Sequence, residues 1–222
     1  MNYNFDFLVL WPYWPQLLWG CWMTLWLAVV SVVSGFLVGL LTAVVRDSAF
    51  APLRWLAIGY VELIRNTPFL LQIFFIFFGL PSIGISLNPW PAAVLALSLN
   101  CGAFSSEIIR QGIDAVPRGQ LEAGRALGLS APQIFRFIVL KPALRIIFPA
   151  LAGQFILALL TTSIASSISA EELTSVAQSI DTVTFRSFEI YLVITLLYFG
   201  LSYVFASVFK AITQTFFAYP VK

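Results

Sequence analysis

The sequence contains no histidine and only two cysteines among its 222 residues. Because Cys21 and Cys101 both lie inside apolar runs, the sequence supports neither a disulfide framework nor a Cys/His metal site. None of the thirteen glycines is followed by lysine, which excludes a Walker A phosphate loop. We therefore expect no metal and no cofactor on this chain.

Charged residues are also scarce. They make up 10% of the chain, against 60% hydrophobic residues and a mean hydropathy of +0.93. Such a chain is too apolar for a water-soluble domain, and its net charge of +2, spread between apolar runs, does not favour nucleic acid. The first fifteen residues lack the basic stretch and cleavage site of a signal peptide. We predict an all-α integral membrane protein with a single domain over residues 1–222.

Five apolar runs have the length of membrane spans. Lys and Arg are absent before the first run and concentrated in alternate loops, which predicts an outside N-terminus and a cytoplasmic C-terminal tail up to Lys222. The aromatic residues 1–15 are typical of a segment at the membrane–water interface. The predicted spans are Leu17–Val45, Leu53–Leu80, Ala92–Gly112, Ile146–Ser167 and Ile190–Phe209.

The first span carries a small residue at every fourth position, which indicates close packing against another helix. These positions are Ser31, Gly35, Gly39 and Ala43.

One long polar stretch, residues 107–145, interrupts this apolar sequence and holds half of its basic residues. Within it, Pro117 in a first turn and Gly128 just past the last turn bracket a short helix. Ser130 and Gln133 have the spacing of a capping box at the start of a second short helix. Two capped helices in a cytoplasmic loop, about 113–145, indicate a surface presented to a partner.

The loop contains the run Glu122-Ala123-Gly124, followed by Gly128, Ile138 and Leu140. This pattern resembles the EAA signature of the membrane subunits of bacterial ABC importers. Gly124 departs from the signature by replacing an alanine, and Lys141 occupies a proline position, with Pro142 one place late. The resemblance implies that the loop docks into a separate ATPase subunit, with Glu122, Ala123, Gly124 and Gly128 as coupling residues. The residues that carry it are Glu122, Ala123, Gly124, Gly128, Ile138 and Leu140.

Two further stretches, VELIRNTPFLLQ (61–72) and LSLNCGAFSSEIIRQGI (97–113), resemble the permeases of polar amino acid importers. Membership would make this chain a multi-pass permease of the bacterial inner membrane that changes conformation by alternating access. It would work with a second permease, identical or homologous, and with an outside substrate-binding protein. A dimer of ATP-binding subunits would hold ATP and Mg. The expected contacts are then a polar amino acid and membrane lipid.

Polar side chains inside spans are costly against lipid and mark candidate pathway positions. Hydroxyl groups can instead bond to their own helix backbone, so simple packing stays open for the Ser/Thr-rich run. Arg65 is either an anchor at the inner interface or part of the pathway. The candidate pathway residues are Gln72, Asn100, Glu107, Gln154, Thr161, Thr162, Ser163 and Ser166.

Local pairings and caps are also predicted. Helical spacing places Arg65 beside Glu62 and Arg110 beside Glu107. The acidic residues 168–189 are typical of an external loop with a short helix capped near Ser169.

Other functions stay open at this point. One is an importer permease for another small solute, such as methionine or an oxyanion. Another is a membrane enzyme using Glu62, Glu107 or Ser163, although no nucleophile–base spacing supports it. Ion-gradient transport is a third, disfavoured by the odd number of spans without an inverted repeat. Thr162 stands where family members often place a carboxylate, which favours an uncharged or acidic amino acid such as glutamine or glutamate.

Overall fold

The computed structural model describes residues 4–216, and the elements within them are helical. Four helical stretches are long and apolar enough to cross a membrane, and a bent pair makes a fifth. The predicted all-α membrane fold with about five spans is thus confirmed. In chain order the elements are η1 (Phe7–Tyr13), α1 (Trp14–Arg46), α2 (Ala51–Arg65), α3 (Phe69–Phe74), η2 (Phe75–Gly79), η3 (Leu80–Ile83), α4 (Pro89–Asp114), α5 (Arg118–Ala126), α6 (Ala131–Ile134), η4 (Phe135–Val139), α7 (Leu140–Thr161), η5 (Thr162–Ile168), α8 (Leu173–Thr184) and α9 (Ser187–Phe216).

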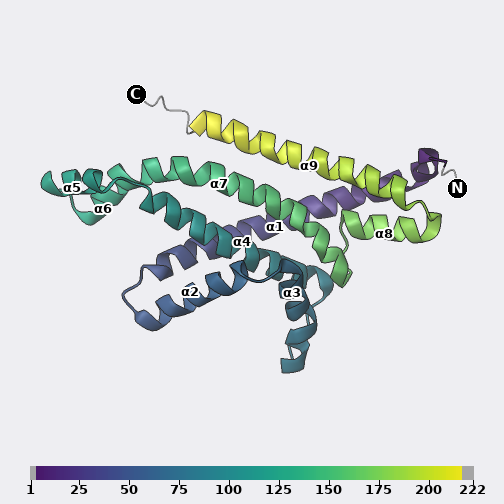
Figure 1. The fold of residues 1–222 in the computed structure, drawn as a ribbon, viewed down its shortest axis with the longest axis horizontal. Helices are drawn as coiled ribbons and strands as arrows, with labels where there is room; N and C mark the ends of the chain where they lie inside the picture. The colour runs from purple at the N-terminus through teal and green to yellow at the C-terminus, as the bar shows by residue number, and fades with distance from the viewer. Residues whose placement is uncertain (1–3, 217–222) are drawn as a thin grey trace.

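Figure 1 shows the long helices α1, α4, α7 and α9 running along the length of the molecule. The short helices α5 and α6 lie at one end, and α8 lies at the other end with the start of the chain. Helix α3 leaves this body at a steep angle. The predicted coupling loop and the predicted external loop therefore lie at opposite ends.

Helices α1 and α4 form the closest pair of the fold. A Cβ atom built on Gly35 would lie 2.8 Å from Cys101 Cβ, and one on Gly39 would lie 2.7 Å from Ser105 Cβ. Both approaches are shorter than real Cβ contacts, so the two backbones meet only because α1 has no side chain there. The predicted packing role of the small-residue stripe is correct.

The second predicted span, Leu53–Leu80, is wrong as a continuous helix. Helix α2 ends at Arg65, α3 begins at Phe69, and the chain bends by 114° between them. Pro68 is the cause, because it has no N–H to donate and disfavours helical geometry at the residue before it. Asn66 closes α2 by donating its backbone N–H to Glu62 O at 3.1 Å.

The fourth predicted span, Ile146–Ser167, is too short. Helical structure runs without a break from Ala131 to Ile168, through a π-helical turn in η4 and a 3-10 segment in η5. The second short helix of the loop is therefore the beginning of this span and not a separate helix.

The external helix α8 is capped by Glu172, which accepts from Ser175 N–H at 2.7 Å. The predicted cap near Ser169 is wrong, since Ser169 ends η5 in a left-handed conformation with φ 59°.

The N-terminal segment 4–13 is held at the same end as α8. Asp6 accepts from Leu8 N–H at 3.1 Å, and Arg186 donates to Asn4 O at 2.9 Å. Residues 1–3 of the predicted interfacial segment and residues 217–222 of the predicted cytoplasmic tail lie outside the described residues.

The α1–α4 contact gives a first prediction. Replacing Gly39 by leucine should destabilise the protein by roughly 1–3 kcal/mol or more, because Ser105 and the α4 backbone leave no room for a side chain. Gly59→Leu is the matched control, since a Cβ at Gly59 meets nothing within 4 Å. Thermal unfolding of the purified variants in one detergent measures the difference. Equal melting temperatures for the two would contradict close α1–α4 packing.

Candidate functional site

Two regions hold the predicted functional residues, and they lie apart along the molecule. The first is the loop helix α5 with the start of the long α6–α7 helix. The second is the break between α2 and α3, which packs against α4 and η5.

Helix α5 ends in a complete Schellman motif. Gly128 has φ 75°, its N–H donates to Arg125 O at 2.9 Å, and Leu129 N–H donates to Gly124 O at 3.1 Å. This pairing satisfies the last carbonyls of the helix and uses the conformational freedom of glycine. The predicted helix between Pro117 and Gly128 is correct, although Pro117 is its N-cap and not a first-turn residue.

Gly124 lies buried where α5 contacts the next helix. A Cβ there would lie 2.4 Å from Ile138 Cδ1. The departure from the alanine of the signature therefore lets α5 approach Ile138 closely. On the outer side, Glu122 and Ala123 are exposed, and Leu127 is 80% exposed.

The second short helix begins as predicted. Gln133 Oε1 accepts from Ser130 N–H at 2.8 Å, which is the returning half of a capping box. Between α5 and α7 lies a groove of about 880 Å³.

At the second region, Gln72 closes the broken span. Its Nε2 donates to Ile64 O at 2.8 Å and to Thr67 O at 3.0 Å, and its Oε1 accepts from Asn100 Nδ2 at 3.0 Å. These bonds satisfy backbone carbonyls that the break would leave unpaired inside the membrane. The structure thus brings together two of the predicted pathway residues, Gln72 and Asn100.

Glu107 lies on the same side of α4, two turns from Asn100, and is 8% exposed. Arg46 donates to Glu107 Oε2 at 2.7 Å, while Arg110 donates to Oε1 at 2.9 Å and Gln111 to Oε1 at 3.3 Å. Arg110 is shared with Asp114 at 2.9 Å. This carboxylate is fully paired and ties the end of α1 to α4.

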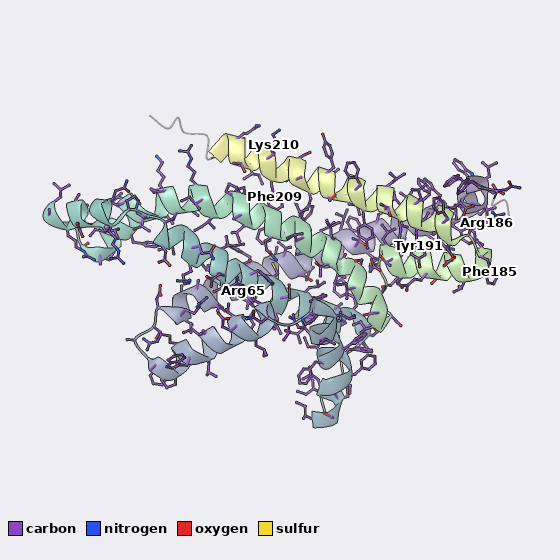
Figure 2. The ribbon with its side chains drawn as sticks, in the orientation of Figure 1. Arg65, Phe185, Arg186, Tyr191, Phe209 and Lys210 are labelled. Carbon is purple, nitrogen blue, oxygen red and sulfur yellow. The ribbon has the colours of Figure 1, made fainter. Side chains whose placement is uncertain are left out.

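Arg65 approaches Glu107 Oε2 at 3.8 Å, and its guanidinium lies 5.8 Å from the centre of the Phe104 ring. Figure 2 shows it near the middle of the molecule, where α2 meets α4. The predicted pairing of Arg65 with Glu62 is wrong, since Glu62 instead accepts from Asn66 Nδ2 at 3.1 Å. The predicted pairing of Arg110 with Glu107 is correct.

The hydroxyl groups of the fourth span bond to their own helix. Thr161, Thr162, Ser163 and Ser166 donate to backbone carbonyls three or four residues earlier at 2.7–2.8 Å. Thr162 is fully buried, and the other three are half-buried. Segment η5 contacts α3 and α4, so these residues lie beside the break. Their role in the pathway stays a prediction.

Gln154 lies two turns before Thr161 on α7 and is half-buried. Its side chain makes no hydrogen bond within residues 4–216, and nothing in the structure joins it to Gln72 or Asn100.

A buried carboxylate near the outer end was missed by the sequence analysis. Glu172 is fully buried and accepts from Tyr198 OH as well as from Ser175 N–H. Burial raises the pKa of Glu172, while the hydrogen bond from Tyr198 opposes this rise. Arg46 was also missed as part of a site, because its charge indicated only a cytoplasmic loop. The Glu172–Tyr198 and Arg46–Glu107 pairings have no sequence signal, since the two residues of each pair are distant in the chain.

Comparison with known proteins identifies the architecture. Residues 9–217 match the family described as "Binding-protein-dependent transport system inner membrane component". The chain belongs to this family. It is therefore a membrane transport permease.

Individual relatives agree. The L-cystine transport system permease protein TcyB of Bacillus subtilis is 42% identical over 76% of this chain and 72% of its own length. The glutamine transport system permease protein GlnP of Escherichia coli is 34% identical over 95% of this chain and 97% of its own. A crystal structure of an amino acid ABC transporter with histidines is 37% identical, with a TM-score of 0.90 over 96% of this chain and 99% of that one.

Proposed function

We propose that this chain is the permease subunit of an ATP-driven importer that moves an uncharged polar amino acid across the inner membrane. The observation that carries the proposal is the broken span closed by Gln72 and Asn100. Transporter substrate sites are commonly formed by polar groups at a helix break inside the membrane. The named substrates of relatives, which include cystine, glutamine and arginine, favour a polar amino acid over methionine or an oxyanion.

The charges support an uncharged substrate side chain. A cationic side chain would need an acidic partner in the low-dielectric pathway. Glu107 cannot provide one, because Arg46 and Arg110 already occupy both of its oxygens. The Thr162 hydroxyl donates to Leu159 O at 2.7 Å, so this position offers no charge either.

The opposite ends of the molecule support the orientation, with the N-terminus outside and the C-terminus inside. The end with α5 and α6 carries many basic residues, as expected on the cytoplasmic side. The end with α8 is mostly acidic and would face the substrate-binding protein. The basic residues of the first end include Arg118, Arg125, Arg136, Lys141 and Arg145.

ATP and Mg would be bound by a dimer of separate ATPase subunits that receives α5. A movement of α5 reaches Ile138 through its contact with Gly124. From Ile138 a single helical stretch runs to Ile168 in η5, which packs beside the α2–α3 break. Coupling through this continuous helical stretch would let nucleotide-driven closure of the ATPase subunits reposition the pathway. A second permease, identical or homologous, would complete the pathway.

The coupling role predicts unequal effects of two glycine substitutions in the loop. Gly128→Ala places a side chain at φ 75°, which costs roughly 1–2 kcal/mol and should reduce ATP-driven uptake, because it disfavours the helix end that the ATPase subunits would receive. Gly119→Ala is the control, because a Cβ there meets nothing within 4 Å and alanine favours the helix. Uptake into proteoliposomes with the ATPase subunits measures both. Normal uptake by Gly128→Ala would remove this helix end from the coupling.

Substrate charge is tested by competition. In proteoliposomes containing the complete importer, unlabelled L-glutamine should inhibit uptake of a mixture of radiolabelled amino acids. L-arginine and L-lysine should leave uptake near its uninhibited level, because the pathway offers their side chains no unpaired carboxylate. Strong inhibition by arginine with none by glutamine would show that the charge argument is wrong.

A further inference from the structure

Arg65 lies at the break of a membrane span and carries a charge. Its side chain makes no hydrogen bond within residues 4–216. Its nearest acidic atom, Glu107 Oε2, lies at 3.8 Å, beyond hydrogen-bond distance. The Phe104 ring lies 5.8 Å from the guanidinium and covers one side of it. The side chain is 35% exposed. A guanidinium carries five N–H donors, so these donors remain available for a ligand.

Arg65 ends α2, while Arg54 lies near its start, beside the predicted first cytoplasmic loop. Eleven residues of helix separate the two, which is roughly 16 Å along the axis of α2. Charged side chains within membrane spans commonly mark substrate pathways.

Glu107 does not need Arg65 for neutralisation. Arg46 and Arg110 bond to its two oxygens at 2.7 and 2.9 Å, both closer than Arg65. Arg65 is therefore the most distant of three arginines around the Glu107 carboxylate. The positive charge of Arg65 is only partly balanced by this carboxylate.

Asn100 supplies the complementary group. It lies one helical turn from Phe104, which places their Cβ atoms about 5–6 Å apart. Its Nδ2 donates to Gln72 Oε1, while its Oδ1 receives no donor from residues 4–216. Gln72 also links Asn100 to the carbonyl of Ile64, the residue before Arg65. A guanidinium and a free amide oxygen on these two helices match the carboxylate and ammonium groups that every α-amino acid carries.

We propose that Arg65 binds the α-carboxylate of the transported amino acid as a bidentate pair, while Asn100 Oδ1 accepts from its α-ammonium group. Arginine suits this role because its planar fork matches a carboxylate. The inference rests on the proposed amino acid import and adds the residue that recognises the common part of these substrates. Figure 2 shows the side chain at the meeting point of α2 and α4.

The experiment compares amino acids with their decarboxylated amines. The permease–ATPase complex is purified in nanodiscs without a binding protein, so that binding reports on the permease alone. The probes are L-glutamine with 4-aminobutanamide, and L-cystine with cystamine. The variants are Arg65→Gln, Arg65→Lys and, as the matched control, Arg54→Gln, which removes another arginine from α2.

We expect the wild-type complex to bind the amino acid roughly tenfold or more tightly than the matching amine, as a charge-assisted pair provides. Arg65→Gln should abolish this preference, and Arg65→Lys should keep part of it. Arg54→Gln should keep the full preference.

Two results would overturn the inference alone. One is a full preference for the carboxylate in Arg65→Gln. The other is an equal loss of amino acid and amine binding in Arg65→Gln, since this indicates a purely structural role. If neither glutamine nor cystine binds to the intact wild-type complex, the proposed function fails and the inference fails with it.

Discussion

A membrane span that breaks must satisfy its freed backbone groups without the help of bulk water, and the rest of this structure depends on how that is done. Pro68 makes the break unavoidable, and the amide of Gln72 closes it by bonding to Ile64 O and Thr67 O. Asn100 holds Gln72 in turn from α4. Because α4 packs tightly against α1 through Gly35 and Gly39, the break is supported by the most closely packed pair of helices in the fold.

The same helix α4 carries a second support two turns further along. Glu107 forms ion pairs with Arg46 from the end of α1 and with Arg110 from its own helix, and Arg65 approaches it from the break. Asn100, through Gln72, and Glu107, through Arg65, thus contact the two sides of the α2–α3 break. Segment η5 approaches this segment from the far end of the long helix that begins beside α5. The fold therefore connects the cytoplasmic loop and the broken span through a single element.

The sequence predicts the parts of this arrangement that depend on local chemistry. Apolar length predicted the spans, small residues predicted the α1–α4 contact, and Gly128 with Gln133 predicted the loop caps. The missed features depend on tertiary structure. The predicted span Leu53–Leu80 runs across Pro68, where the chain bends by 114°, and contacts of Gln72 with Ile64 O and Thr67 O hold this bend. Glu62 and Glu107 each have an arginine three residues later in the chain. Only Glu107 forms ion pairs with arginines, since Arg65 approaches Glu107 and Arg46 reaches it from another helix. The hydroxyl residues were correctly predicted to lie in the fourth span, but their hydrogen bonds stay within their own helix.

The central claim is that the amino acid is bound at the α2–α3 break beside α4. The most direct measurement is a cryo-electron microscopy structure of the assembled importer with its transported amino acid bound. The account predicts ligand density in contact with Arg65 and Asn100, with the chain still bent between α2 and α3. Ligand density elsewhere in the permease, or a straight helix through residues 51–83, would contradict it.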